Sequence, residues 1–451
     1  MMYDVIVAGA GSAGCMAAYT AAKRNFDVCL VDAKPKERIG DKICGNGFGY
    51  HHAEKIGFSI PEHVKTNQID GIINYSPSGH EWRVPGGRYK GVMLNRLAFG
   101  QYLLNMAIET GTELKDKTII RGPIIKNDFV KGIITHSGEI YADVVIDATG
   151  LKSPLRSKLP ESFGIETKIE DKDVNVAYRE IRKVRYGLKN EKYCEIYLDP
   201  DKFPGGYAWI FPQSKNSVNV GLGIQKLKNC PNPKKRFYET VLKMELFENS
   251  EVIEKGGMDV STRRSLSSLV GNGVLISGEA GSIVDPITGS GNGQALVTGK
   301  SAADVACDAL ENGRKDRESL WGYNLKHYTE KDGYGQRYTP LDAFRIFLQS
   351  VNPRDLDYGR EHEIIKEEDL VALTTEGELK LNISEKARRF FKGIGRLSLL
   401  KNLIYIKNVM EEIKIHCLNY PNSSDGLNAW KEKTDSIFSK LEKGFKPYTC
   451  K

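Results

Sequence analysis

The sequence predicts an α/β fold (α+β overall): a Rossmann-type nucleotide-binding domain, an inserted antiparallel-sheet domain and a helical C-terminal region. Three observations predict it. The first 32 residues follow the order strand, glycine turn, helix, strand. Residues 174–223 are rich in short strand patterns, and the chain beyond residue 315 turns helical and charged.

The opening motif is a glycine-rich turn after an apolar run, Gly9-Ala10-Gly11-Ser12-Ala13-Gly14. Gly9 supplies the tight turn, Gly11 lets the backbone approach a pyrophosphate, and Gly14 lets the next helix pack close to the sheet. That helix, expected to end near Arg24, directs its N-terminal amides at the phosphates. Asp32 follows at the spacing of about 20 residues expected of a ribose-binding acid. Strand, helix and acid together favour dinucleotide binding over a glycine turn without a ligand.

Two later stretches favour FAD over a nicotinamide cofactor. Val144–Gly150 is a buried strand ending in a small-residue turn, which suits a strand beneath the cofactor. Gly273–Gly281 is another such strand, and its Gly278-Glu279 turn offers an acid to the ribityl hydroxyls. Pro286–Gly293 then opens a helix that runs to about Leu310. The positive end of this helix beside a flavin pyrimidine would stabilise the anionic reduced ring.

The composition fits an enzyme of two or three domains. The excess of 65 basic over 58 acidic residues is only +7 in 451 residues, which gives no case for nucleic acid. No stretch approaches the ~18 apolar residues of a membrane span, so any lipid contact is expected to be peripheral. Eight cysteines without a Cys-x-x-Cys pair or a histidine cluster predict no metal site and a reducing, cytoplasmic location. The N-terminus leaves no room for a signal peptide.

The loop Ile39–Gly47 is glycine-rich and charged, and it holds the cysteine best placed for chemistry, Cys44. Its flanking glycines and the nearby cofactor favour a role in the site; the alternative is a small, half-buried hydrophobe in a turn. His51 and His52 follow on a short helix. His52 is a candidate contact for a substrate phosphate, with packing or solvent exposure as the alternative.

A second domain is expected to begin with short strands over Gly71–Val84, joined by a hairpin-type turn. An amphipathic helix then starts at Asn95 and stops at Gly111. Arg96, near the start of this helix, is either a surface charge or a phosphate contact. A strand near Thr118–Ile120 returns the chain to the central sheet.

An aromatic row lies at the centre of the strand-rich region. Tyr207, Trp209 and Phe211 occupy alternate positions and therefore share one face of a strand. Val218–Gly223 is the returning strand. Such a row is usually core packing, and lining a ligand cavity is the alternative.

The helical region has its clearer helices at Tyr323–Tyr328, Leu341–Leu348 and Leu397–Leu418. The last has lysines among its apolar residues, which indicates either a packed helix with a solvated face or a membrane-surface helix. The expected domains are residues 1–68, 92–160 and 262–315 for FAD binding, 69–91 and 161–261 for catalysis and substrate, and 316–451 for the helical region.

Four features in combination resemble a known family. They are the opening fingerprint, Asp41-Lys42-x-Cys44-Gly45, the row Tyr207-x-Trp209-x-Phe211-Pro212 followed by Gly221-x-Gly223, and the Gly278-Glu279 turn with its Gly289-x-Gly291 helix start. Over nearly the whole chain they resemble the archaeal geranylgeranyl reductases, FAD enzymes of the para-hydroxybenzoate hydroxylase fold group. The resemblance implies saturation of isolated double bonds of geranylgeranyl chains, in geranylgeranyl diphosphate or in the digeranylgeranylglycerophospholipids of archaeal membranes.

The resemblance also favours a substrate cavity lined by the aromatic row. Motifs and resemblance together give as FAD contacts Gly9, Gly11, Ala13, Gly14, Asp32, Lys42, Cys44, Gly45, Arg96, Ile120, Gly278, Glu279, Gly291 and Asn292. The candidate substrate contacts are His52, Tyr207, Trp209 and Phe211, and the candidate catalytic residues are Cys44 and Tyr207. Glu279 departs from the family, in which the turn acid is usually Asp, and the extra methylene should shift the ribityl contact.

The reaction needs a proton as well as a hydride from the reduced flavin. No carbonyl polarises an isolated alkene, so the alkene is protonated before or during hydride transfer and positive charge develops on the tertiary carbon. The faces of Tyr207 and Trp209 stabilise such a charge by about 2 kcal/mol when desolvated. Cys44 is the best-placed proton donor, although a thiol of pKa ~8.5 is a weak acid; Tyr207 or a bound water is the alternative.

Two other functions stay open from the sequence alone. A flavin monooxygenase shares the fold group, and an electron-transfer flavoprotein would reduce a quinone, although the chain has no cysteine cluster for an iron–sulfur centre. The sequence has no second glycine fingerprint for NADPH, so NADPH and ferredoxin are both candidate electron donors. The expected substrate is a prenyl diphosphate or a prenylated glycerophospholipid, with peripheral contact at the inner face of the membrane.

Overall fold

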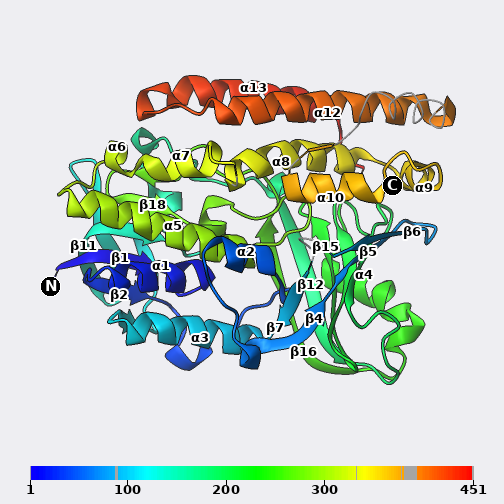
Figure 1. Ribbon diagram of the computed structural model, residues 1–451, viewed down its shortest axis with the longest axis horizontal. Coiled ribbons are helices and arrows are strands. Elements are labelled where there is room, and N and C mark those ends of the chain that lie inside the picture. The colour runs from blue at the N-terminus through cyan, green and yellow to red at the C-terminus, as the bar shows by residue number, and fades with distance from the viewer. Residues whose placement is uncertain (1, 87–89, 332, 377, 380–393, 449–451) are drawn as a thin grey trace.

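The computed structural model describes residues 2–86, 90–331, 333–376, 378–379 and 394–448. A largely parallel sheet lies on the N-terminal side of the molecule, and an antiparallel sheet lies beside it (Figure 1). Helices from the C-terminal third cover both (Figure 1). The expected α/β fold class is confirmed.

The first sheet has eight strands, with β1 (Met2–Ala8) at its centre. Its parallel strands are β18 (Val274–Ile276), β11 (Gly138–Asp147), β1, β2 (Val28–Val31) and β8 (Glu113–Lys115), in that order. Antiparallel strands extend it: β17 (Val270–Gly271), β10 (Phe129–Thr135) and β9 (Ile120–Lys126). The central strands are buried on both faces, which explains their nearly continuous apolar sequences.

Three helices pack around this sheet and set the position of the cofactor site. The helix α1 (Ser12–Lys23) follows the glycine turn and packs against both α3 (Arg96–Glu109) and α5 (Asn292–Glu311). Asn95 caps α3, because its Oδ1 accepts a hydrogen bond of 3.0 Å from the backbone N–H of Ala98. The three helix starts lie close together: Ala13 of α1 and Ala295 of α5 both border Gly278, and Arg96 of α3 lines one pocket with Ser12 of α1.

The second sheet has seven strands and supplies the face of the expected substrate domain. Its order is β16 (Glu251–Ser261), β12 (Val174–Lys183), β15 (Ser217–Gln225), β14 (Tyr207–Ser214), β13 (Tyr193–Tyr197), β5 (Gly71–Tyr75) and β6 (Glu81–Pro85). All pairs are antiparallel except β13 with β5. A separate core closes one face under α4 (Pro233–Glu239).

A small sheet connects the two large ones. It consists of β3 (Gly47–Gly49), β7 (Gly91–Leu94) and β4 (Lys65–Ile69), and α2 (Tyr50–Lys55) follows β3 directly. Ile69 and Met93 from this sheet pack with Cys194 and Phe211 of the antiparallel sheet. The loop that carries Cys44 therefore leads into the junction between the two large sheets.

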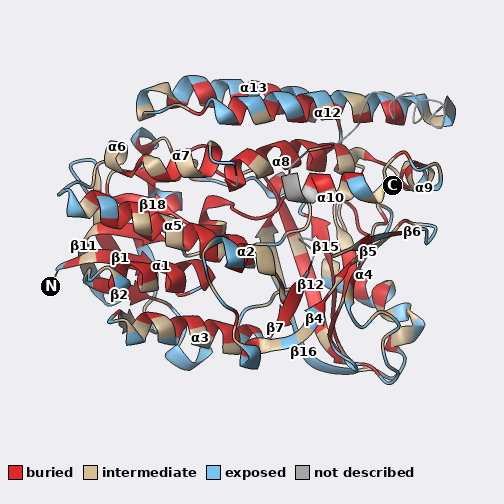
Figure 2. Ribbon diagram, in the orientation of Figure 1, coloured by how far each residue is buried: buried red, intermediate tan, exposed pale blue. Residues whose placement is uncertain are grey.

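The C-terminal helices form two layers over the sheets (Figure 1). They are α6 (Arg317–Leu320), α7 (Gly322–Tyr328), α8 (Tyr334–Ser350), α9 (Pro353–Glu361), α10 (Glu367–Glu376), α12 (Leu397–Leu418) and α13 (Leu427–Gly444). The outermost pair, α12 and α13, buries one stripe and exposes the other (Figure 2). Within the part of the chain that the structure describes, no helix is long and apolar enough to cross a membrane.

Two expected elements have different bounds in the structure. The helix expected at Leu341–Leu348 begins seven residues earlier, at Tyr334, and contains Pro340. An interior proline costs roughly 3 kcal/mol, and the nearly complete burial of α8 outweighs that cost. The strand expected near Thr118 begins at Ile120, because the N–H of Thr118 donates to the carbonyl of Asp32 instead (2.8 Å).

Candidate active site

The turn between β1 and α1 leaves room for a phosphate group. Gly9 has a φ of +94°, which gives the tight turn. A side chain at Gly14 would collide with the carbonyl oxygen of Gly9, so only glycine lets the helix start this close to the strand. A Cβ at Gly11 would meet no atom within 4 Å. The first amides of α1, including that of Ala13, therefore border open space where an anion is favoured.

Asp32 stands at the end of β2 beside this turn. Its Oδ2 accepts a hydrogen bond of 2.7 Å from the N–H of Ala10, and its Oδ1 accepts one of 2.8 Å from the N–H of Lys34. Each carboxylate oxygen has a second lone pair, so Asp32 can still accept from a ribose hydroxyl. The chain before Ile120 lies next to Asp32, because Thr118 bonds to its carbonyl.

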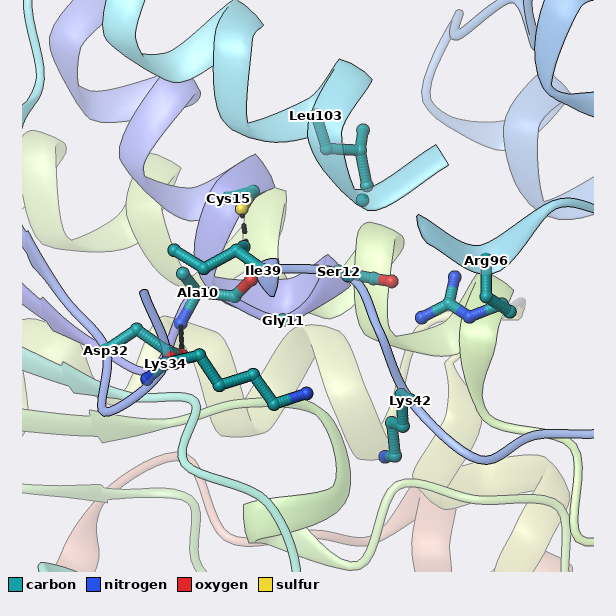
Figure 3. Close-up of a pocket in the computed structure, with 12 residues that line it drawn as sticks. Ala10, Gly11, Ser12, Cys15, Asp32, Lys34, Ile39, Lys42, Arg96 and Leu103 are labelled. Carbon is teal, nitrogen blue, oxygen red and sulfur yellow. Dashed lines mark hydrogen bonds between the residues drawn. The ribbon is translucent and has the colours of Figure 1, made fainter. Parts of the chain in front are cut away.

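Arg96 lies across the pocket from the glycine turn. Its guanidinium points toward the start of α1, near Ser12 (Figure 3). Arg96 is only 8% exposed, and its Nε and Nη1 have no hydrogen-bond partner in the described residues. A buried cation with unused donors, facing a helix N-terminus, fits a pyrophosphate, and Gly11, Asp32 and Lys42 line the same pocket. These residues fit FAD.

Lys42 bridges from the glycine-rich loop to the turn after β18. Its Nζ lies 3.1 Å from Oε2 of Glu279, which sits in the short helical turn Gly278–Gly281. The Glu279 carboxylate raises the pKa of Lys42. The other oxygen of Glu279, Oε1, is buried and finds no partner within the described chain. That oxygen is free to accept a hydrogen bond from a ribityl hydroxyl.

Cys44 faces the start of α5. Its Sγ accepts a hydrogen bond from the N–H of Asn46 (3.3 Å) and one from Nδ2 of Asn292 (3.4 Å). Asn292 is the first residue of α5, directly after Gly291. The thiol therefore lies at the helix end that the sequence predicts beside the flavin pyrimidine, and Gly45 lies next to Phe211.

The aromatic row lies on one face of β14, as expected. The ring centroids of Tyr207 and Trp209 are 6.0 Å apart, and those of Trp209 and Phe211 are also 6.0 Å apart. The hydroxyl of Tyr207 donates to the carbonyl oxygen of Thr288, in the segment before α5. Burial raises the pKa of this hydroxyl, so Tyr207 is neutral at physiological pH.

Asn219 joins the aromatic row to the loop of Cys44. Its Oδ1 accepts a hydrogen bond of 3.0 Å from Nε1 of Trp209, and its Nδ2 donates one of 2.7 Å to the carbonyl of Cys44. Asn219 is completely buried. Trp209 and Cys44 are therefore held at a fixed separation by one side chain.

His52 lies on α2, next to Gly293 in the first turn of α5. It is buried, and its Nδ1 is 2.7 Å from the hydroxyl of Tyr334 on α8. The predicted packing role is thus visible in the structure, and contact with a substrate phosphate stays a prediction.

Sequence reasoning missed Asn219 and Asn46. Asn219 stands between two valines in a buried strand. Because a buried polar side chain needs a hydrogen-bond partner, this pattern indicates a hydrogen bond to another element. Asn46 adopts a φ of +66° after Gly45, and its Oδ1 is buried without a partner among the residues described. Nothing in the loop sequence separates Asn46 from an ordinary turn residue.

Comparisons with known proteins agree with this geometry. A family model described as geranylgeranyl reductase catalytic domain matches residues 173–260, and one described as FAD dependent oxidoreductase matches residues 4–153. The digeranylgeranylglycerophospholipid reductase of Sulfolobus acidocaldarius is 37% identical, over 98% of this chain and 99% of its own length. The enzyme of that name from Methanosarcina acetivorans is 33% identical over 74% of this chain and 82% of its own.

Solved structures share the fold. A geranylgeranyl bacteriochlorophyll reductase-like protein from Thermoplasma acidophilum superposes with a TM-score of 0.73 at 22% identity, covering 90% of this chain and 99% of its own. A halogenase solved in complex with FAD has a TM-score of 0.62 at 15% identity, covering 99% and 97%. The expected cofactor and the family resemblance are both confirmed. The chain is an FAD-dependent oxidoreductase and belongs to the digeranylgeranylglycerophospholipid reductase family.

Proposed function

We propose that this protein saturates the isolated double bonds of the geranylgeranyl chains of a prenylated glycerophospholipid, with geranylgeranyl diphosphate as a second substrate of the same chemistry. The observation that carries the proposal is the aromatic row of β14, tied through Asn219 to the loop of Cys44. An apolar chain over this row would bring a double bond near both the flavin pocket and a thiol. The names of the relatives support the lipid substrate.

Bound FAD in its reduced form supplies the hydride. The residues proposed to hold it are the turn of Gly9, Gly11 and Gly14, the carboxylates of Asp32 and Glu279, and the guanidinium of Arg96. The domain division given above, with FAD on the parallel sheet and lipid on the antiparallel sheet, is part of this proposal. This division is supported by the topology, because in the part of the chain that the structure describes the two large sheets have no strand in common.

Cys44 is the proton donor that we propose. Its Sγ accepts hydrogen bonds from Asn46 and Asn292, which leaves the S–H proton available to the alkene. The hydroxyl proton of Tyr207 is engaged by the carbonyl of Thr288, so Tyr207 can donate only after this bond breaks. We therefore propose that Tyr207 and Trp209 chiefly stabilise positive charge on the tertiary carbon.

The electron donor and the membrane contact are also proposals. NADPH or ferredoxin would reduce the flavin, and anaerobic bleaching of the flavin absorbance by each would identify the donor. A lipid substrate implies peripheral contact with a membrane surface. The outermost helix α12 exposes Leu397, Tyr405 and Ile415, which supports such contact. Co-sedimentation with archaeal lipid vesicles would test it.

The decisive experiment is anaerobic incubation of the FAD-loaded protein with dithionite and digeranylgeranylglycerophospholipid, followed by mass spectrometry of the extracted lipid. Products heavier in steps of two hydrogens are expected from the wild-type protein. Cys44→Ala should keep its FAD and lose most of this activity, whereas Cys307→Ala, a buried cysteine of α5, serves as a matched control.

Unchanged lipid with a stably reduced flavin would contradict the proposal. Substrate-dependent oxygen consumption with hydroxylated product would instead indicate a monooxygenase. Electron transfer to a quinone without lipid reduction would indicate an electron-transfer flavoprotein.

A further inference from the structure

A buried arginine shares the sheet face of the aromatic row. Arg179 on β12 lies opposite Gly221 on β15, and Gly221 lies opposite Trp209 on β14. Residues directly opposite each other on antiparallel strands project to the same face. Arg179 and Trp209 therefore lie on one face of the sheet, two strands apart.

Glycine on each neighbouring strand keeps side chains away from Arg179. A Cβ at Gly221 would lie 2.5 Å from Cζ2 of Trp209 and 2.7 Å from Cβ of Arg179. On the other side, a Cβ at Gly256 would lie 2.5 Å from Cδ1 of Ile43, the residue before Cys44. Arg179 is thus enclosed between the aromatic row and the loop that carries Cys44.

Most hydrogen-bond donors of Arg179 are unpaired within the described chain although the side chain is deeply buried. Its side chain is 2% exposed, yet Nε and Nη1 have no partner among the residues that the structure describes. Nη2 donates to Oε1 of Glu254 at 2.6 Å. Glu254 is 44% exposed, so solvent weakens this ion pair. A buried guanidinium with unused donors is costly unless an anion binds it.

A second arginine on the same strand shows the contrast. Arg182 points to the opposite face, where Nε and Nη2 donate to Oγ and the carbonyl of Ser250 (2.9 and 2.8 Å) and Nη1 donates to Glu180. A structural arginine of this sheet therefore has a partner on every nitrogen. Arg179 does not.

We propose that Arg179 binds the phosphate group of the lipid substrate and that Glu254 covers its guanidinium until the lipid arrives. This inference rests on the proposed function, since both candidate lipids carry phosphate. Arginine binds phosphate best through two parallel N–H groups. A guanidinium offers two such edges, Nε with Nη2 and Nη1 with Nη2. Because Nη2 belongs to both, Glu254 must release it before a phosphate can bind in this way.

The spacing suits a single lipid that reaches both groups. Two strand intervals separate β12 from β14, about 10 Å. A phosphate at Arg179 and a prenyl chain over Trp209 can therefore belong to one molecule. The phosphate would then fix which double bonds lie over the aromatic row.

The test compares two lipids that differ only in the phosphate: digeranylgeranylglycerol phosphate and neutral digeranylgeranylglycerol. Dithionite supplies the electrons, and mass spectrometry gives the KM for each lipid. Arg179→Met should raise the KM for the phosphorylated lipid roughly 10- to 100-fold and leave that for the neutral lipid unchanged. Glu254→Gln should lower the KM for the phosphorylated lipid several-fold, because it removes the competing carboxylate.

Lys183→Met is the matched control, because Lys183 is an exposed cation on the same face of β12. It should change neither KM. If the wild-type protein reduces neither lipid, the proposed function is wrong and the assignment of Arg179 is wrong with it. If the wild type reduces both and Arg179→Met alters both KM values equally or neither, only the assignment of Arg179 is overturned. A shifted midpoint potential of the bound flavin with unchanged lipid preference would assign Arg179 to the cofactor instead.

Discussion

Two buried arginines in two regions of the molecule have opposite environments. Arg345 on α8 lies where the helical layer meets the antiparallel sheet, and all but one of its N–H donors are paired within the protein. Nε and Nη2 pair with Asp342 (2.8 and 2.7 Å). Nη2 also pairs with Asp173 (3.1 Å), and Nη1 donates to Gln349 (2.9 Å). Arg96 in the pocket of the parallel sheet leaves Nε and Nη1 without partners in the described residues.

Whether its donors are paired within the protein distinguishes an arginine that stabilises the fold from one that is available to bind a ligand. Desolvating a guanidinium costs several kcal/mol, so a partnered one such as Arg345 stabilises only as part of its network. For an unpartnered guanidinium such as that of Arg96, the unfavourable desolvation free energy is offset only when an anion binds. Substituting each should therefore change a different property of the protein.

The largest effect is expected at Asp342, the completely buried partner of Arg345 and Arg264. Asp342→Ala leaves two buried guanidinium groups without this carboxylate and should lower the free energy of unfolding by about 3–5 kcal/mol. Denaturant unfolding measures the loss. Asp435→Ala removes an exposed carboxylate 3.8 Å from Arg264 and should cost less than about 1 kcal/mol. Equal losses would contradict the assigned role of the buried network.

Arg96→Met should weaken FAD binding without destabilising the FAD-free protein. Hydrogen bonds to a charged group contribute about 1.5–3 kcal/mol, so the Kd for FAD should rise roughly 10- to 100-fold. Titration of the FAD-free protein with FAD measures this. Arg121→Met removes an exposed arginine of β9 and is the control. A destabilised FAD-free protein with unchanged FAD affinity would place Arg96 with Arg345 instead.

The buried side chain of His327 extends the comparison of the two arginines to a group that is uncharged in the folded protein. Burial lowers the pKa of His327 to about 3, and its Nε2 lacks a partner within the described chain. The unfolded chain has a histidine pKa of about 6.5, so between these values it binds a proton that the folded protein does not. Stability should therefore fall as the pH drops below about 6.5, by at most about 1.4 kcal/mol per pH unit.

Unfolding free energies measured from pH 7 to pH 4.5 would show this slope, and His327→Gln should flatten it. An identical slope in His327→Gln would mean that other groups cause the acid sensitivity.

Lys42 is expected to have the smallest effect. Its side chain is 51% exposed, so its pair with Glu279 contributes at most about 1 kcal/mol. Lys42→Met should raise the Kd for FAD no more than about fivefold, and added salt should reduce the difference between variant and wild type. A large, salt-independent loss would mean that Lys42 contacts the cofactor as directly as Arg96.

The sequence predicted the parts of the molecule that local chemistry determines. The glycine turn from Gly9 to Gly14, the helix start at Asn95 and the alternation of the aromatic row each need only neighbouring residues, and the structure confirms all three. The helix α8 was predicted too short, because Pro340 is tolerated only through burial against other elements.

The parts that depend on distant pairing were not predictable. Asn219 reaches Cys44 across 175 positions of the chain. Tertiary packing also decides that Arg345 has partners and that Nε and Nη1 of Arg96 have none among the described residues. In the sequence, Arg96 is a candidate phosphate contact, whereas Arg345 looks like an ordinary helix residue. Only the structure shows that one is compensated and the other is not.

The measurement that tests this account most directly is a crystal structure with FAD and a phosphorylated prenyl lipid bound. The account predicts pyrophosphate oxygens of FAD at hydrogen-bond distance, about 2.7–2.9 Å, from Nε or Nη1 of Arg96. It also predicts prenyl carbons over Tyr207 and Trp209, near Sγ of Cys44. A structure in which Arg96 stays without a partner beside bound FAD, or in which the prenyl chain lies away from the aromatic row, would contradict it.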